Sequence, residues 1–332
     1  MDLGSEDRLH TWLRKQLSDQ GFDRLGDDGA ILPPTGPWTV TVDHQIAGVH
    51  FPSDLDPARI ARRSLAVNLS DLAAMGAKPR FAFLALSCPS TFDSRRFFSA
   101  LMTACKRYGV ELAGGDLARS CHVAAVLTVV GQRAPRGRWV RRSSGRVGDR
   151  LWLGGPVGLA SLGQQLLERG ASIVGRRVSL PPGLALTEAS QKLARRTVRI
   201  HLLPEPQINL GVWLGRRRRA AAIDISDGLA MDLHRLCRES QVGAEISASQ
   251  LPVARRFEEL CRALELDPLQ VLLGGGEDYV LLFALPPRLR PPATYGCSPL
   301  GRLVDGRRLS LIRNDGTQPL PVLGWDHFRT RD

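Results

Sequence analysis

Aspartates with glycine or serine neighbours recur where the sequence predicts a strand to end or a helix to begin. They are Asp27, Asp28, Asp43, Asp71, Asp116, Asp224 and Asp227. Gathered at one sheet edge, such carboxylates would repel each other by roughly 1 kcal/mol per pair at about 4 Å in water. Hard cations such as Mg²⁺, shared with phosphates, relieve that repulsion. The set predicts a magnesium site for a polyphosphate, although any one aspartate is equally well read as a helix cap or a turn former.

Two glycine clusters precede acidic residues. Gly114-Gly115 stands before Asp116, and a glycine triplet at 274–276 stands before Glu277. Glycine lets backbone N–H groups approach a ligand closely. The P-loop pattern GxxxxGK[ST], a usable GxGxxG and the protein-kinase HRD and DFG motifs are absent, which excludes those nucleotide-binding classes. The histidines are scattered and GxSxG is missing, so nucleophilic catalysis is disfavoured; His50, close after Asp43, is the one histidine kept as a site candidate.

The elements that position these residues alternate between helix and strand. An amphipathic helix is predicted over 1–20, and a capped helix is predicted to start at Asp56-Pro57 and stop at Gly76. Another helix is predicted over 94–108, a fourth after Gly154-Gly155-Pro156, and a fifth from Asp227 to about 239. Strands are predicted at 38–42, 81–86, 110–113, 123–130, 150–153, 221–225, 279–283 and, as the last strand, 308–312. Residues 171–183 and 286–298 are interpreted as loops.

The alternation favours an α/β fold of two domains. A basic, glycine-containing stretch at 133–149 has the composition of a boundary, and we expect the domains to meet near residue 145. The predicted domains are therefore 1–145 and 146–332.

Composition limits the possible partners. The chain has 332 residues and a net charge of +12, carried mostly by arginine. Its basic stretches are not interleaved with stacking aromatics, so we favour a solvated surface over nucleic-acid binding. No apolar run reaches the roughly 18 residues of a membrane span, and the N-terminus lacks secretory-signal features, so we expect a cytoplasmic protein without membrane contact. The six cysteines form no CxxC pair, which disfavours zinc and disulfide frameworks.

Seven motifs occur in order along nearly the whole chain. They are GDDGAIL (26–32), TVDHQIAGVHF (41–51), VNLSDLAAMGAKP (67–79), GGDLARS (114–120), DISDGLAMDLHRL (224–236), GGGEDYVLLF (274–283) and GWDHF (324–328). GGD or SDG alone is a weak signal, but the ordered set resembles the thiamine-monophosphate kinase family. The resemblance implies the two-domain fold shared with aminoimidazole ribonucleotide synthetase, mixed in its α and β structure, with homodimers formed through an N-terminal β-barrel.

The resemblance also implies a reaction and the residues that serve it. ATP would phosphorylate thiamine monophosphate to thiamine diphosphate with several Mg²⁺ ions, by direct in-line transfer. The implied metal ligands are Asp28, Thr41, Val42, Asp43, Asp71, Asp116, Asp224 and Asp227. The implied ATP contacts are Gly115, Asp116, Arg142 and Ser226. The implied thiamine monophosphate contacts are His50, Glu277 and Trp325.

Some positions depart from the family pattern, and other functions remain open. Val42 stands where the family commonly has Thr, so it is a weaker metal candidate that could act through its backbone oxygen. Leu117 replaces a common Thr after GGD.

Three alternative functions remain open: a sister enzyme of the same fold, a basic nucleic-acid-binding protein, and a homologue that binds nucleotide without catalysing a reaction. Aminoimidazole ribonucleotide synthetase is disfavoured by the GGGEDY and VNLSDLAAMGAKP forms, and selenophosphate synthetase by the absence of a Cys or Lys pair ahead of GDD.

Overall fold

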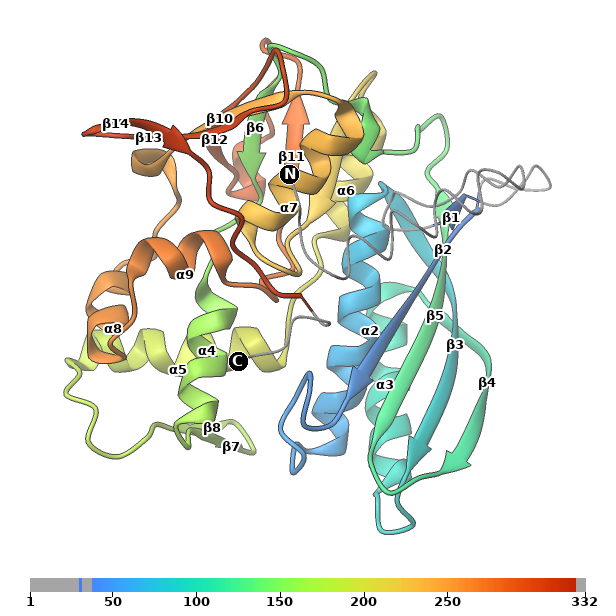
Figure 1. Cartoon of the computed structure of the whole chain (residues 1–332). Helices are drawn as coiled ribbons and strands as arrows, with labels where there is room; N and C mark the ends of the chain where they lie inside the picture. Colours follow the sequence, from blue (N-terminus) through green and yellow to red (C-terminus); the bar gives the residue numbers. More distant parts are fainter. Residues whose placement is uncertain (1–29, 32–37, 327–332) are drawn as a thin grey trace.

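The computed structural model describes residues 30–31 and 38–326, and its secondary structure mixes helices with two large sheets (Figure 1). The helix predicted over 1–20, Asp27 and Asp28 lie outside the described residues. The first sheet is built from residues between 30 and 133, and the second from residues between 150 and 319. A mixed α/β fold is thus confirmed.

The first sheet has five strands in the order β1-β2-β5-β3-β4. Their bounds are β1 Ala30–Ile31, β2 Trp38–Ile46, β3 Ala77–Cys88, β4 Glu111–Arg119 and β5 Ala124–Arg133. Only β3 and β4 pair in parallel; the other neighbours are antiparallel. Helices α2 (Pro57–Ala74) and α3 (Ser94–Tyr108) cover one face (Figure 1). Burial alternates along β3 and β5, because successive side chains point to opposite faces.

Helix α2 lies between the two sheets and contacts both. The Asp56 carboxylate accepts the backbone N–H of Ala58 at 2.8 Å, and Pro57 occupies the first turn, as the sequence predicts. The helix ends before Gly76, which has a φ of +70° and leaves no room for a Cβ, since Val140 Cγ2 would lie 2.9 Å away. Because α2 packs on strands of both sheets, it fixes how the two sheets face each other.

The second sheet has seven strands in the order β14-β13-β10-β12-β6-β11-β9. Their bounds are β6 Arg150–Leu153, β9 Ala221–Asp224, β10 Gly243–Ser247, β11 Leu281–Leu285, β12 Ser298–Val304, β13 Leu309–Arg313 and β14 Gly316–Pro319. The helices of this half are α4 Leu159–Glu168, α5 Glu188–Leu202, α6 Ile208–Gly215, α7 Leu229–Ser240, α8 Phe257–Ala263 and α9 Pro268–Gly274. Single 3₁₀ turns form at η1 Arg142–Ser144, η2 Ala248–Gln250 and η3 Ala293–Tyr295.

Four details of the predicted elements are wrong. Asp43 lies inside β2 rather than at its end, and the GGD segment lies inside β4. The predicted loop at 171–183 contains a small hairpin, β7 Ser172–Val174 with β8 Arg177–Ser179, and β14 follows the strand predicted to be last. The last three share a reason: β4, β7 and β14 lie mostly exposed, so they carry no strict apolar alternation for a pattern to detect.

Candidate active site

A cavity of about 390 Å³ opens where the first sheet, α2 and the loops of the second sheet meet. Its wall comes from β2 and the loop after it, α2, α4, and the loops around residues 224–227, 274–279 and 324–325. The lining residues that the sequence predicts for a site are Asp43, His50, Asp71, Asp224, Ser226, Asp227, Glu277 and Trp325. Folding therefore brings most of the predicted site together from five separate segments.

Four of the lining residues are aspartates. Asp43 comes from β2, Asp71 from the last turns of α2, and Asp224 and Asp227 from the end of β9 and the loop after it. The Thr41 hydroxyl donates a hydrogen bond to the Asp71 carboxylate, so Thr41 supports this wall from a buried position. Carboxylate and hydroxyl oxygens are the donors that Mg²⁺ prefers.

The carboxylates surround the cavity rather than forming one compact ligand cage. Within the described residues, no three His, Cys, Asp or Glu side chains come close enough to hold one ion together. Mg²⁺ usually takes only one or two protein carboxylates and completes its shell with water and substrate phosphates. The donor set therefore fits Mg²⁺ whose shell would be completed by water and substrate phosphates.

The loop Ser226-Asp227-Gly228 is held by a carboxylate that the sequence analysis missed. Asp232 Oδ2 accepts backbone N–H groups from Ser226 and Asp227 at 3.1 Å and from Gly228 at 3.2 Å. Its Oδ1 accepts from Arg235 at 3.0 Å, and burial raises the pKa of Asp232 to about 7. Its position in the first turn of α7 was the available signal, because a carboxylate there faces the free N–H groups of the helix start.

The glycine triplet packs loops against each other. A Cβ on Gly276 would lie 2.4 Å from the Ser226 carbonyl oxygen, and one on Gly275 would lie 2.5 Å from that of Val271. The Glu277 N–H then donates to the Ser226 carbonyl at 2.7 Å. Gly274 and Gly276 also line the cavity. The triplet thus lets two loops approach closely while keeping their backbone beside the cavity.

Asp278 is a structural cap rather than a site residue. Its carboxylate accepts N–H groups from Gly158 at 2.5 Å and from Ala160 at 2.9 Å, at the start of α4. The flanking residues Glu277 and Tyr279 have φ values of +62° and +50°. Such left-handed backbone costs about 1–3 kcal/mol per non-glycine residue and persists only where surrounding contacts hold it.

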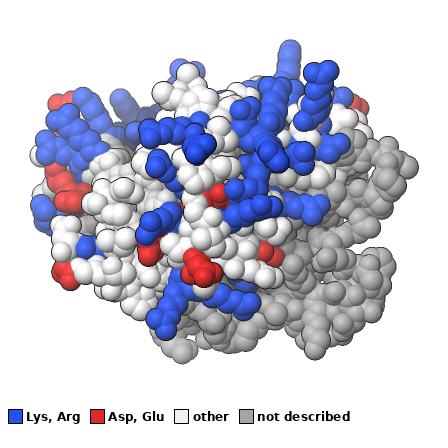
Figure 2. Space-filling view, turned by 90° about the horizontal axis from the view of Figure 1, so that it is seen from above, with Lys and Arg blue, Asp and Glu red and all other residues white. Residues whose placement is uncertain are grey.

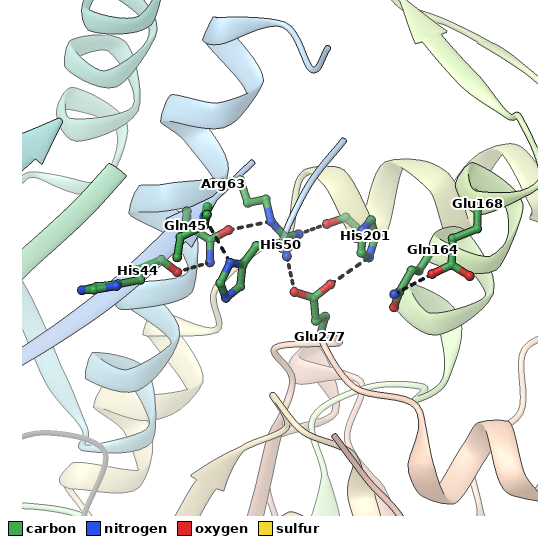
Figure 3. Close-up of polar contacts among 9 residues, drawn as sticks. His44, Gln45, His50, Arg63, Gln164, Glu168, His201 and Glu277 are labelled. Atoms are coloured by element: carbon green, nitrogen blue, oxygen red, sulfur yellow. Dashed lines mark hydrogen bonds and ion pairs between the residues drawn. The ribbon is translucent and has the colours of Figure 1, made fainter. Parts of the chain in front are cut away.

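Glu277 belongs to a polar network centred on Arg63, a second residue that the sequence analysis missed (Figure 3). The fully buried Arg63 guanidinium contacts Glu277 and the His201 carbonyl, and its Nε donates to Gln45 Oε1 at 2.8 Å. His201 Nδ1 lies 3.0 Å from the other Glu277 oxygen. The signal was an arginine among the apolar positions of α2.

The network keeps Glu277 ionised. Burial by itself raises the pKa of Glu277, but the charge of Arg63, the contact with His201 and the nearby His50 outweigh it and lower the pKa to about 2. The cavity therefore presents a carboxylate with a fixed orientation and a fixed charge.

His50 and Trp325 complete the wall of the cavity. The Ile46 N–H donates to His50 Nδ1 at 3.1 Å, which orients the imidazole ring beside the cavity (Figure 3). The Trp325 backbone N–H donates to the Asp227 carbonyl at 2.8 Å, and Trp325 is 37% exposed. An indole and a carboxylate at one cavity suit a cationic or aromatic ligand.

Several predicted residues do not line this cavity. Gly115 and Asp116 lie on the exposed edge strand β4, where a Cβ on Gly115 would lie 1.9 Å from the Leu84 carbonyl oxygen. The Val42 side chain is 54% exposed, on the sheet face opposite to α2. Arg142 begins η1, and its carbonyl accepts from the Ser240 hydroxyl. Asp28 lies outside the described residues.

Comparison with known proteins relates this geometry to a family. The family described as AIR synthase related protein, N-terminal domain, matches residues 26–132. The thiamine-monophosphate kinase of Escherichia coli strain K12 is 34% identical over 319 residues, covering 92% of each chain. That of Synechococcus elongatus is 34% identical over 328 residues, covering 93% of this chain and 92% of the relative.

Solved structures agree over the same length. A structure described as AaThiL complexed with AMPPCP and TMP matches with a TM-score of 0.82 at 27% identity, covering 96% of each chain. The thiamine-monophosphate kinase of Stenotrophomonas maltophilia K279a matches with a TM-score of 0.70 at 30% identity, covering 91% of this chain and 95% of that one. By its sequence over nearly its whole length, the chain belongs to the thiamine-monophosphate kinase family.

Proposed function

We propose that this protein transfers the terminal phosphoryl group of ATP to thiamine monophosphate, giving thiamine diphosphate and ADP. The observation that carries the proposal is the convergence of four aspartates and Glu277 on one cavity. It is supported by 34% identity to a thiamine-monophosphate kinase over 92% of the chain and by the fold match to a relative described as complexed with AMPPCP and TMP.

The chemistry needs little proton transfer. The acceptor phosphate oxygen is already anionic, so it attacks without a strong general base, and we assign no side chain as a catalytic acid or base. The barrier lies in bringing two anions into line, which positioning and charge neutralisation lower. The cavity aspartates would hold Mg²⁺, which would supply that neutralisation.

We assign the metal contacts to the aspartate wall. Asp43, Asp71, Asp224 and Asp227 line the cavity, and Thr41 supports Asp71. Asp28, Asp116 and the backbone oxygen of Val42 complete the proposed set. The ATP contacts are assigned to Gly115, Asp116, Arg142 and Ser226, of which Ser226 lines the cavity.

The thiamine monophosphate contacts are assigned to His50, Glu277 and Trp325. A thiazolium ring carries a positive charge, and both an ionised carboxylate and an indole face attract such a ring. Arg63 and His201 keep Glu277 ionised, so the site presents a negative group to the cationic part of the acceptor.

The homodimer is proposed to form through the first sheet. β1 and β4 are its two edges, and the face opposite α2 exposes apolar side chains, with Val42 at 54% and Phe83 at 42%. A second copy would cover these side chains, and paired edges would close a joint β-barrel. Residues 1–145 would then form the dimerisation and ATP domain, and residues 146–332 would complete the acceptor site.

The last part of the proposal is where the protein acts. Among the described residues, the longest apolar helical stretches are too short or too polar to cross a bilayer. We propose a cytoplasmic enzyme that acts without membrane or nucleic acid.

Acceptor specificity tests the proposed reaction. Purified protein is incubated with ATP and Mg²⁺ together with thiamine monophosphate or with unphosphorylated thiamine, and products are separated by chromatography. We expect thiamine diphosphate from the monophosphate and no product from thiamine, whose hydroxyl would need a base. Phosphorylation of thiamine but not of its monophosphate would exclude the proposed acceptor.

A further inference from the structure

A second cavity, of about 330 Å³, shares no lining residue with the candidate active site. Its wall comes from two distant segments, residues 133–144 and residues 214–220. The arginine pocket, as we name it, is lined by Arg133, Arg138, Arg141, Arg217, Arg218 and Arg219. No aspartate or glutamate is among its lining residues, and Figure 2 shows that Lys and Arg side chains also predominate over one face of the molecule.

The floor of the arginine pocket is firmly built. The Arg138 N–H donates to the Gly215 carbonyl at 2.7 Å, and the Val140 N–H donates to the Met75 carbonyl at 3.1 Å. A Cβ on Gly215 would lie 3.1 Å from the Gly76 carbonyl oxygen and 3.2 Å from that of Arg138. Close backbone packing therefore fixes the two segments relative to each other, and the pocket is formed before any ligand arrives.

Two of the six arginines are held by neighbours. Arg219 pairs with the buried Asp149 through both guanidinium nitrogens, one of them at 2.8 Å. Arg217 lies over the Trp213 ring at 4.6 Å and donates Nε–H to the Trp213 carbonyl at 3.2 Å. These contacts fix two guanidinium groups at the pocket wall.

Among the residues that the structure describes, no carboxylate forms an ion pair with the other four arginines, which are Arg133, Arg138, Arg141 and Arg218. Like charges around one cavity repel each other and raise the local concentration of anions. The planar guanidinium fork matches two phosphate oxygens at once, so phosphate groups are its best-fitting partners.

The number of charges and the shape of the cavity select among anions. A single phosphate carries at most about two negative charges near neutral pH, fewer than the positive charges of this pocket, whereas a short phosphate chain carries more. Single-stranded nucleic acids are usually bound by basic grooves with several stacking aromatics, and Trp139 is the one aromatic residue lining this pocket. We propose that the arginine pocket is a binding site for a compact polyphosphate anion, separate from the candidate active site.

Isothermal titration calorimetry tests this site with sodium tripolyphosphate as the probe. EDTA is present, so that metal-dependent binding at the candidate active site is suppressed. The test variant is Arg138→Gln with Arg218→Gln, which removes two exposed charges from the pocket. The matched control is Arg255→Gln with Arg262→Gln, which removes two exposed charges elsewhere. Melting temperatures check that all three proteins fold alike.

We expect the wild type and the control to bind one tripolyphosphate per chain. The test variant should bind it with an affinity about tenfold or more lower, because losing one hydrogen bond to a charged group weakens binding by about that factor. A parallel titration with CTP distinguishes two kinds of ligand. If CTP binds more tightly than tripolyphosphate, the ligand is a nucleotide; if CTP binds equally or more weakly, the ligand is a free polyphosphate. No binding to the wild type, or equal weakening in both double variants, would overturn the proposal. So would a thymidine oligonucleotide that binds and is not displaced by tripolyphosphate.

Discussion

At the scale of single residues, the charge of Glu277 depends on three neighbours from distant parts of the chain. Arg63 comes from α2, His201 from the end of α5 and His50 from the loop after β2. A glutamate in a left-handed loop conformation is otherwise unfavourable, and burial would favour its neutral form. The contacts with Arg63 and His201 offset both costs.

Replacing Arg63 with methionine should therefore destabilise the protein strongly. The Arg63→Met variant keeps a long side chain but leaves a largely buried carboxylate without its partner, which costs about 3–5 kcal/mol. Glu277→Gln removes that carboxylate. The variant that combines Arg63→Met with Glu277→Gln should therefore be more stable than the sum of the stability losses of the two single variants predicts. Urea unfolding of the four proteins measures this coupling; strictly additive losses would show that the pair is not coupled.

The same pair predicts a pH dependence. The pKa of Glu277 is lowered from 4.5 to about 2, so its ionised form contributes stability above pH 4.5 that is lost as the pH falls towards 2. The difference in unfolding free energy between wild type and Glu277→Gln should have its maximum value at pH 6 and should decrease below about pH 4. Denaturant curves at both pH values measure it, and a constant difference would argue against an ionised Glu277.

At the scale of elements, the cavity depends on loops that close onto each other. Asp232 in the first turn of α7 accepts three N–H groups of the loop that presents Ser226 and Asp227. Motif order could identify those two residues. It could not identify Asp232 or Arg63, because their roles are to hold other groups, and such roles depend on which loops meet after folding.

Removing the Asp232 carboxylate should disturb the loop more than the fold. In Asp232→Ala, three N–H groups lose their acceptor, and we expect kcat for thiamine diphosphate formation to fall by about 100-fold, as displacements near 1 Å commonly produce. Asp232→Asn retains one acceptor oxygen and should lose less. Steady-state kinetics with both variants test this, and an unchanged kcat in Asp232→Ala would rule out the positioning role.

The sequence predicts elements well where apolar residues repeat. The helix capped by Asp56 and the helix ended by Gly109 form as predicted, as does the strand at 150–153. The prediction is wrong for exposed strands such as β4, which is specified by pairing with β3 rather than by its own pattern. The aspartates of the cavity could be predicted because several carboxylates gathered at one sheet edge repel each other unless cations neutralise them.

At the scale of the whole molecule, we expect the exposed apolar face of the first sheet to be covered by a partner surface. Val42 and Phe83 share this face and should lie inside the proposed dimer, so Val42→Glu with Phe83→Glu should convert a dimer to a monomer in sedimentation analysis. Val174→Glu, at a side chain 79% exposed on β7, is the matched control and should leave the dimer intact. A monomeric wild type would contradict the proposed dimer.

The most direct test of the proposed function is ADP release coupled to an optical readout, with ATP, Mg²⁺ and thiamine monophosphate. The proposal predicts that release requires the acceptor and Mg²⁺ together and falls by at least about 1,000-fold in Asp71→Asn, since metal-assisted charge neutralisation supplies several kcal/mol. Folded wild-type protein that binds ATP yet releases no ADP with this acceptor, or an Asp71→Asn variant with full activity, would contradict it.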